Sequence, residues 1–84
     1  MVKQKMNHRD IFKQILGKHI RKKREEKGLT IQEVAFDINM DDKHLGRIER
    51  GKKLPSSFTL AKIQLEIDLH SDEYLHEFKE TIKE

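Results

Sequence analysis

The side chains with the clearest potential for chemistry lie within residues 42–50, which carry two cations at helical spacing. Lys43 and Arg47 are four residues apart, so both project from one face of a helix. An arginine can donate two hydrogen bonds to O6 and N7 of guanine, and a lysine can bind the same atoms less rigidly. Asp42 can accept a hydrogen bond from N4 of cytosine, and His44 lies at the margin of this face. These residue types suit contact with bases, and the alternative is an ordinary solvated helix face.

Two short helices joined by a tight turn must position these side chains, and the first of them is predicted over residues 31–38. Thr30 is a favourable N-cap, because its hydroxyl can accept a hydrogen bond from a backbone N–H at the start of the helix. Val34 and Ile38 then fall on one apolar face. Asn39 ends the pattern, since its short side chain tolerates left-handed backbone.

The second short helix is predicted over residues 42–50, with Asp41 as its N-cap. Leu45 and Ile48 are its apolar pair, and Gly51 ends it where a left-handed residue without a Cβ is favourable. Helices joined by so short a turn cross at a steep angle, which leaves the outer face of the second helix free to enter a DNA major groove. That face carries Asp42, Lys43, His44, Gly46, Arg47 and Arg50.

These residues form part of a longer pattern. The residues that carry it are Leu29, Thr30, Glu33, Val34, Ala35, Ile38, Asn39, Met40, Leu45, Arg47, Ile48, Glu49, Arg50, Gly51, Pro55, Ser56, Thr59, Leu60, Lys62, Ile63 and Ile67. The pattern resembles the helix-turn-helix of the Cro and phage-repressor (XRE) family of DNA-binding proteins, and it covers about residues 16–70. The resemblance implies an all-α, five-helix fold of the lambda-repressor type. It also implies sequence-specific binding of double-stranded DNA by a homodimer that acts as a transcriptional repressor or regulator.

The resemblance also implies roles for individual residues. The base-reading residues would be Asp42, Lys43, His44 and Arg47, and the phosphate-binding residues would be Thr30, Gln32, Arg50, Lys52, Lys53, Ser56 and Ser57. Family members often carry a phosphate-binding glutamine at the first position of the helix before the recognition helix. Ile31 occupies that position here, which puts the usual contact in doubt.

Two further features of this pattern concern how the recognition helix is held. By the resemblance, Arg24 pairs with Glu49 and joins the first helix to the recognition helix through a bidentate contact. Gly46 is unfavourable within a helix, by about 1 kcal/mol relative to alanine. It would allow close approach to a sugar-phosphate backbone or to another helix, or it is a product of sequence drift.

The chain before the helix-turn-helix divides into a flexible, basic segment, residues 1–10, and a helix that Asp10 would cap and that would run to about Lys27. Gly28 would end this helix. Its apolar residues are Ile11, Phe12, Ile15, Leu16 and Ile20. Residues 11–84 would then be one domain with its core at 16–70. The helix begins earlier than is usual in the family, so its first turns would cover the end of the domain or join a dimer contact.

Two helices are expected after the recognition helix, over residues 57–67 and 72–82, with Ser71 as the N-cap of the second. The first would bury Leu60, Ile63 and Ile67, with Leu54 filling the core before it and Leu65 pointing outward. The apolar stripe of the second would pack on the rest of the domain or contribute to a two-fold dimer interface. The candidate dimer residues are Phe12, Leu65, Tyr74, Leu75 and Phe78.

Composition narrows the class of protein. The 84 residues fit one small domain, whose thin core a dimer would stabilise. Residues 1–67 carry sixteen Lys and Arg against nine Asp and Glu, whereas residues 68–84 carry two against six. This imbalance suits a polyanion bound on one side, with the acidic end turned away from DNA. The chain lacks cysteine and a membrane-length apolar run, so we expect a cytoplasmic protein.

No other chemistry is indicated. The five histidines lack the helical spacing of metal ligands beside an acid, and no glycine-rich phosphate loop or activated nucleophile is present, so we expect no metal, no cofactor and no enzyme. The competing hypothesis is a protein-interaction adaptor or antitoxin, whose main partner would be another protein such as a toxin or an antirepressor. A third is nonspecific nucleic-acid binding, with a steep salt dependence and no sequence preference.

Overall fold

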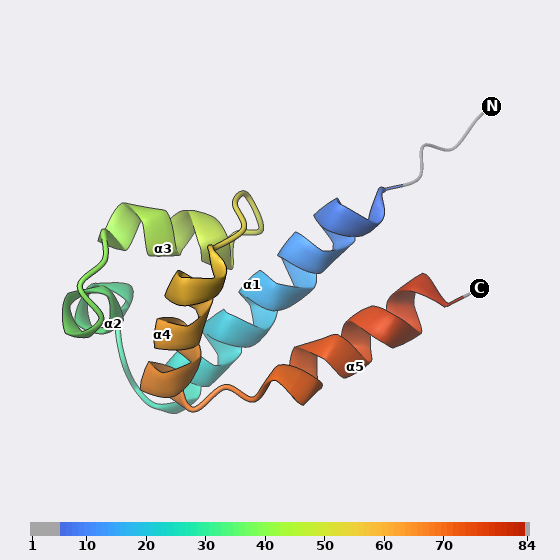
Figure 1. Cartoon of the computed structure of the whole chain (residues 1–84). Helices are drawn as coiled ribbons and strands as arrows, with labels where there is room; N and C mark the ends of the chain where they lie inside the picture. Colours follow the sequence, from blue (N-terminus) through green and yellow to red (C-terminus); the bar gives the residue numbers. More distant parts are fainter. Residues whose placement is uncertain (1–5, 84) are drawn as a thin grey trace.

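The computed structural model describes residues 6–83, and over this range the only regular elements are α-helices (Figure 1). They are α1 (His8–Glu26), α2 (Ile31–Asp37), α3 (Asp42–Glu49), α4 (Ser57–Ile67) and α5 (Ser71–Ile82). The all-α, five-helix architecture expected from the sequence is confirmed. The long helix α1 is central, because α3, α4 and α5 all pack against it, while α2 packs on α3 and α4.

The start of α1 differs from the sequence prediction. The N-cap is Asn7, whose side-chain oxygen accepts a hydrogen bond from the backbone N–H of Asp10 at 2.8 Å. Asp10 was therefore wrongly predicted as the cap, and it lies in the first turn, where its charge complements the positive end of the helix dipole. Residues 8–10, assigned from the sequence to a flexible terminus, are helical; residues 1–5 of that segment lie outside the described range. The helix ends before Gly28, whose φ is 71°.

Local hydrogen bonds fix the remaining helix starts. Thr30 and Glu33 form a reciprocal capping box at α2, with bonds of 2.8 and 3.0 Å. The Asp41 carboxylate accepts from the backbone N–H of Lys43 at 3.0 Å and caps α3. At α5 the predicted cap was wrong by one residue, since His70 is the N-cap and Ser71 is the first helical residue.

The core lies where α1, α2, α3 and α4 meet. Its members are buried aliphatic residues spaced at helical intervals, joined by one residue from the α4–α5 connection and one aromatic residue from α5. They are Ile15, Leu16, Ile20, Val34, Ala35, Ile38, Leu45, Ile48, Ile63, Ile67, Leu69 and Tyr74. Leu60 and Leu54, both expected in the core, are only partly buried at its edge, whereas Leu69 was not anticipated.

Helix α5 packs along α1 through a cluster of three aromatic rings. Phe12 lies edge-on to Tyr74 and to Phe78, with ring centroids 5.9 and 5.2 Å apart. Tyr74 is buried, and its hydroxyl donates to the side-chain oxygen of Gln64 at 3.1 Å. These rings are engaged within the protomer, as expected if the apolar stripe of α5 packs on the domain.

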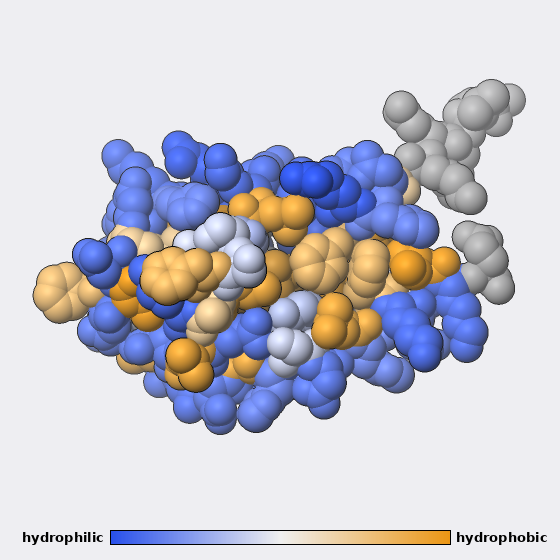
Figure 2. All heavy atoms as spheres, in the orientation of Figure 1, coloured by the Kyte–Doolittle hydropathy of each residue, from blue (hydrophilic) through white to orange (hydrophobic). Residues whose placement is uncertain are grey.

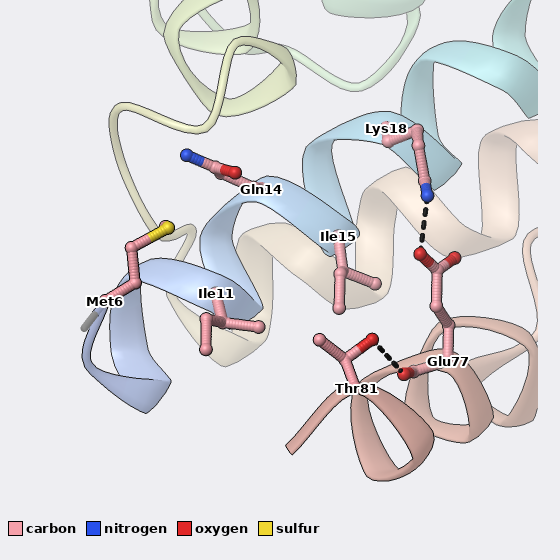
Figure 3. A pocket seen from close by; sticks show the side chains of 7 residues that line it. All are labelled: Met6, Ile11, Gln14, Ile15, Lys18, Glu77 and Thr81. Carbon is pink, nitrogen blue, oxygen red and sulfur yellow. Dashed lines mark hydrogen bonds and ion pairs between the residues drawn. The ribbon is translucent and has the colours of Figure 1, made fainter. Parts of the chain in front are cut away.

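An open groove of about 360 Å³ lies between the N-terminal half of α1 and the C-terminal half of α5 (Figure 3). Met6, Ile11 and Ile15 supply its apolar lining. At its rim Glu77 accepts hydrogen bonds from Lys18 and His19, which together lower the pKa of this carboxyl. These contacts tie the middle of α5 to α1.

Helices α1 and α3 approach each other closely at Gly17 of α1. A Cβ at this position would lie 2.5 Å from the carbonyl oxygens of both Ile48 and Glu49 in α3. Such contacts are with backbone, so no side-chain rotation could relieve them. Gly17 therefore allows α1 to support the recognition helix directly.

We expect Gly17→Ala to lower the free energy of unfolding by about 3 kcal/mol, because the added methyl group would force the α1 and α3 backbones apart. Chemical denaturation of the two proteins measures the difference. Glu26→Ala, on the exposed surface of the same helix, is the control and should change stability by less than about 0.5 kcal/mol. Equal stability of Gly17→Ala and the parent would contradict the close approach.

Candidate nucleic-acid interface

Helices α2 and α3 form two short rods joined by a turn of four residues, 38–41. Asn39 adopts the left-handed conformation predicted for it, with φ at 57°. The backbone N–H of Met40 donates to the carbonyl oxygen of Ala35 at 2.8 Å, which closes the C-terminal end of α2. Leu45 and Ile48 are fully buried, so the opposite face of α3 is turned outward (Figure 1).

The four predicted base-reading residues lie on or beside this outward face. Lys43 and Arg47 are exposed, whereas Asp42 and His44 are half-buried. Asp42 also lies in the first turn of α3, where its charge complements the helix dipole. The two cations are therefore available to an external ligand, and the carboxylate and imidazole flank them.

A groove of about 360 Å³ separates the outward face of α3 from the start of α2. Its lining carries three cations and one carboxylate, together with Gln32, Ile31 and Gly46. The cations are Lys43, Arg47 and Arg50, and the carboxylate is Asp42. The structure thus brings two predicted phosphate residues, Gln32 and Arg50, to the same groove as three of the predicted base-reading residues. The positive excess favours an anion.

The other predicted phosphate-binding residues differ in exposure and in whether their side chains already make hydrogen bonds. Lys52, Lys53 and Ser57 are exposed at the α3–α4 connection. The Ser56 hydroxyl is already engaged as the N-cap of α4, where it accepts from the backbone N–H of Thr59 and donates to the Thr59 hydroxyl, both at 3.1 Å. The Thr30 hydroxyl accepts from Glu33 as a cap, which leaves its own proton available.

Arg24 and Glu49 make the bidentate ion pair that the resemblance implied. The guanidinium Nε and Nη2 donate to the two carboxylate oxygens at 2.7 and 2.9 Å, and Nη1 donates to the Leu29 carbonyl oxygen at 2.8 Å. Only 11% of the Arg24 side chain and 4% of the Glu49 side chain are exposed. The hydrogen bonds to Glu49 raise the pKa of Arg24, which burial alone would lower.

Sequence reasoning missed a second groove beside α3. Its volume is about 350 Å³, and it lies between the C-terminal end of the recognition helix and the basic surface of α1. Arg50 lines it together with Arg21 and Lys22, so this arginine borders both grooves. The signal in the sequence was the row of basic residues at helical spacing on α1, namely Lys18, Arg21 and Lys22.

Two other features are absent from residues 6–83. That range holds no cluster of three or more His, Cys, Asp or Glu side chains suited to a metal ion. No helix in it combines the length and the apolar character that crossing a membrane requires.

The geometry defines a helix-turn-helix domain with a cationic outer face, and comparisons with known proteins agree. The sequence profile of the helix-turn-helix family matches residues 20–74. The "ImmF control region 10 kDa protein" of Bacillus phage phi105 is 43% identical over 54 residues, which are 64% of this chain and 60% of that protein. The match therefore spans less than two thirds of the phage protein's length.

Solved structures show the same fold. The clp gene regulator ClgR from C. glutamicum superposes with a TM-score of 0.72 at 28% identity, covering 86% of this chain and 94% of that one. The restriction-modification controller protein C.Esp1396I, solved as a tetramer with its natural operator, gives a TM-score of 0.68 at 25% identity, covering 86% and 96%. The chain belongs to the helix-turn-helix family.

We expect Arg24→Ala to destabilise the fold by about 3–5 kcal/mol, because it leaves the buried Glu49 carboxylate without its partner. Thermal or chemical denaturation measures the loss. The matched control is the double variant Arg24→Met with Glu49→Leu, which removes both charges and should recover most of that loss. Equal destabilisation by the single and double variants would show that packing, rather than an unpaired charge, dominates.

Proposed function

We propose that this protein is a transcriptional repressor that reads DNA sequence as a dimer, with α3 of each subunit in the major groove. The observation that supports this function is the outward face of α3, where Lys43 and Arg47 are exposed while Leu45 and Ile48 hold the helix on the core. Arg47 would bind guanine through O6 and N7, with Lys43 binding a neighbouring base. Asp42 would accept from cytosine, and His44 would contact the edge of the site.

Contacts to phosphate would set the register of the protein on the duplex. Lys52 and Lys53 project from the α3–α4 connection, next to the exposed Ser57. On the other side of α3, Thr30, Gln32 and the cation Arg50 would bind phosphates along the opposite wall of the DNA major groove. Ser56 would contribute mainly by capping α4 and so shaping the loop.

The dimer surface that we propose comprises the exposed apolar side chains of α4 together with one on α5. Leu65 is 85% exposed, Phe58 is 72% exposed and Leu75 is 47% exposed. Apolar side chains gather over α4 and α5 on the face shown in Figure 2. Of the residues first considered for this contact, Phe12, Tyr74 and Phe78 pack on one another within the protomer, so Leu65 and Leu75 carry the hypothesis and Phe58 joins them.

The relatives support a dimeric regulator. The C.Esp1396I tetramer was solved with its natural 35 base-pair operator, and the phage relative is named for a control region. Two copies related by a two-fold axis would place their α3 helices in half-sites about one turn apart, ~34 Å. Control of a phage or mobile element is the biological setting that these likenesses favour.

We expect selection from a randomised duplex library to recover a palindromic motif at both low and moderate salt. Arg47→Ala should weaken binding to that motif by about 1–3 kcal/mol and relax the preference at one base pair in each half-site. Lys53→Ala is the matched control. It should weaken binding to all sequences alike and lower the slope of log affinity against log salt by about one.

Recovery of no motif, with retention lost at the higher salt, would contradict sequence-specific reading and leave nonspecific binding. Weak DNA binding combined with dependence on α5 residues in the cell would instead favour the adaptor or antitoxin role, with a toxin or antirepressor as partner.

We expect Leu65→Asp to dissociate the dimer and to abolish cooperative binding to the palindrome, because a carboxylate in an apolar interface is strongly unfavourable. Phe36→Asp is the matched control, since Phe36 is also 85% exposed but lies on α2. Sedimentation of both variants measures the effect. If Leu65→Asp stayed as associated as the control, the subunits would have to meet through another surface.

A further inference from the structure

Gly46 lies in the interior of α3, where glycine is unfavourable relative to other residues. It is nevertheless buried, and the atoms that cover it belong to Arg50. A Cβ at position 46 would lie 3.1 Å from Nη1 and 3.9 Å from Cζ of that arginine. The guanidinium thus rests against the bare backbone of the recognition helix.

The helix geometry explains this arrangement. Long side chains on an α-helix lean toward its N-terminus, so residue 50 covers the turn that contains residue 46. The charge of Arg50 is thereby carried about one turn, roughly 5 Å, back along α3 from its own Cα. Arg50 therefore belongs to the outward face of the helix, as the sequence predicted, although α3 itself ends at Glu49.

The surroundings of the guanidinium suit an anion. Arg50 lines the same groove as Ile31 and Gln32, and no hydrogen bond from its guanidinium is found within residues 6–83. Its donors are therefore available to a ligand. Ile31, which faces this groove, offers no polar side-chain atom. A guanidinium beside it supplies several donors in a planar fork that matches phosphate.

We propose that Gly46 is a positioning residue. Because Gly46 has no side chain, the Arg50 guanidinium can lie across the recognition helix, where it binds a backbone phosphate beside Ile31. This inference rests on the proposed function, since the phosphate belongs to bound duplex DNA. It gives Arg50 a defined position at the wall of the groove, and it gives Gly46 a reason to occupy a helix interior.

The experiment is a double-mutant cycle between Gly46→Met and Arg50→Ala. Methionine is a good helix former, so the substitution should leave the denaturation midpoint unchanged or higher while occupying the place of the guanidinium. Each single variant should bind the selected duplex about tenfold more weakly, with the salt slope lowered by about one. The double variant should bind no more weakly than Arg50→Ala alone. Lys79→Ala, an exposed cation on α5, is the control for loss of charge and should bind like the parent.

A second duplex, with scrambled sequence and low salt, separates this inference from the proposed function. If Arg50 contacts a phosphate, the three variants should lose the same affinity on both duplexes, even if the protein has no sequence preference. The Nε–H resonance of Arg50 in the free protein provides a readout without DNA, and it should shift in Gly46→Met. An equal loss of affinity from Gly46→Met in the Arg50→Ala background would overturn the inference, because the methionine would then obstruct DNA directly. An unshifted resonance would overturn it as well.

Discussion

The contact between α1 and α3 is the constraint on which the DNA-binding surface depends. At Gly17 the two backbones approach so closely that a Cβ would overlap the carbonyl oxygens of α3. Two turns further along α1, Arg24 donates from Nε and Nη2 to the two carboxylate oxygens of Glu49 and from Nη1 to the Leu29 carbonyl oxygen. Steric contact fixes the distance between the helices, and the planar ion pair fixes their rotation. An eight-residue helix has little stability alone, so α3 keeps its orientation through these contacts.

Local chemistry made much of the fold predictable from the sequence. Thr30 and Asp41 cap their helices, and Asn39, Gly28 and Gly51 adopt positive φ as their residue types favour. Such features depend on a few neighbouring residues, so the sequence contains what is needed to find them. The pairing of Arg24 with Glu49 could not be predicted from neighbouring residues. It joins residues 25 apart, and only the likeness to a known family made it predictable.

The errors arose where local preferences competed or where packing decided. Asn7 and Asp10 are both good caps three residues apart, and the helix takes the earlier one, which lets Asp10 serve the first turn. The periodicity of the aromatic stripe on α5 fits a dimer contact and an internal contact equally well. Its assignment depends on Phe12, which the extended start of α1 brings between Tyr74 and Phe78. A pattern on one helix does not reveal which partner covers it.

On the role proposed for it, Gly46 is a case in which a local rule fails for a functional reason. Propensity alone disfavours glycine at this position, so a sequence optimised for stability would carry another residue there. The neighbouring turn changes that judgement, because Arg50 uses the space that a side chain would fill. The loss of helix stability is small for a helix that α1 already holds in place. The gain is a cation on the binding face, close to an isoleucine that offers phosphate no hydrogen bond. Rigid support from α1 is therefore what permits an unfavourable residue in the helix that contacts DNA.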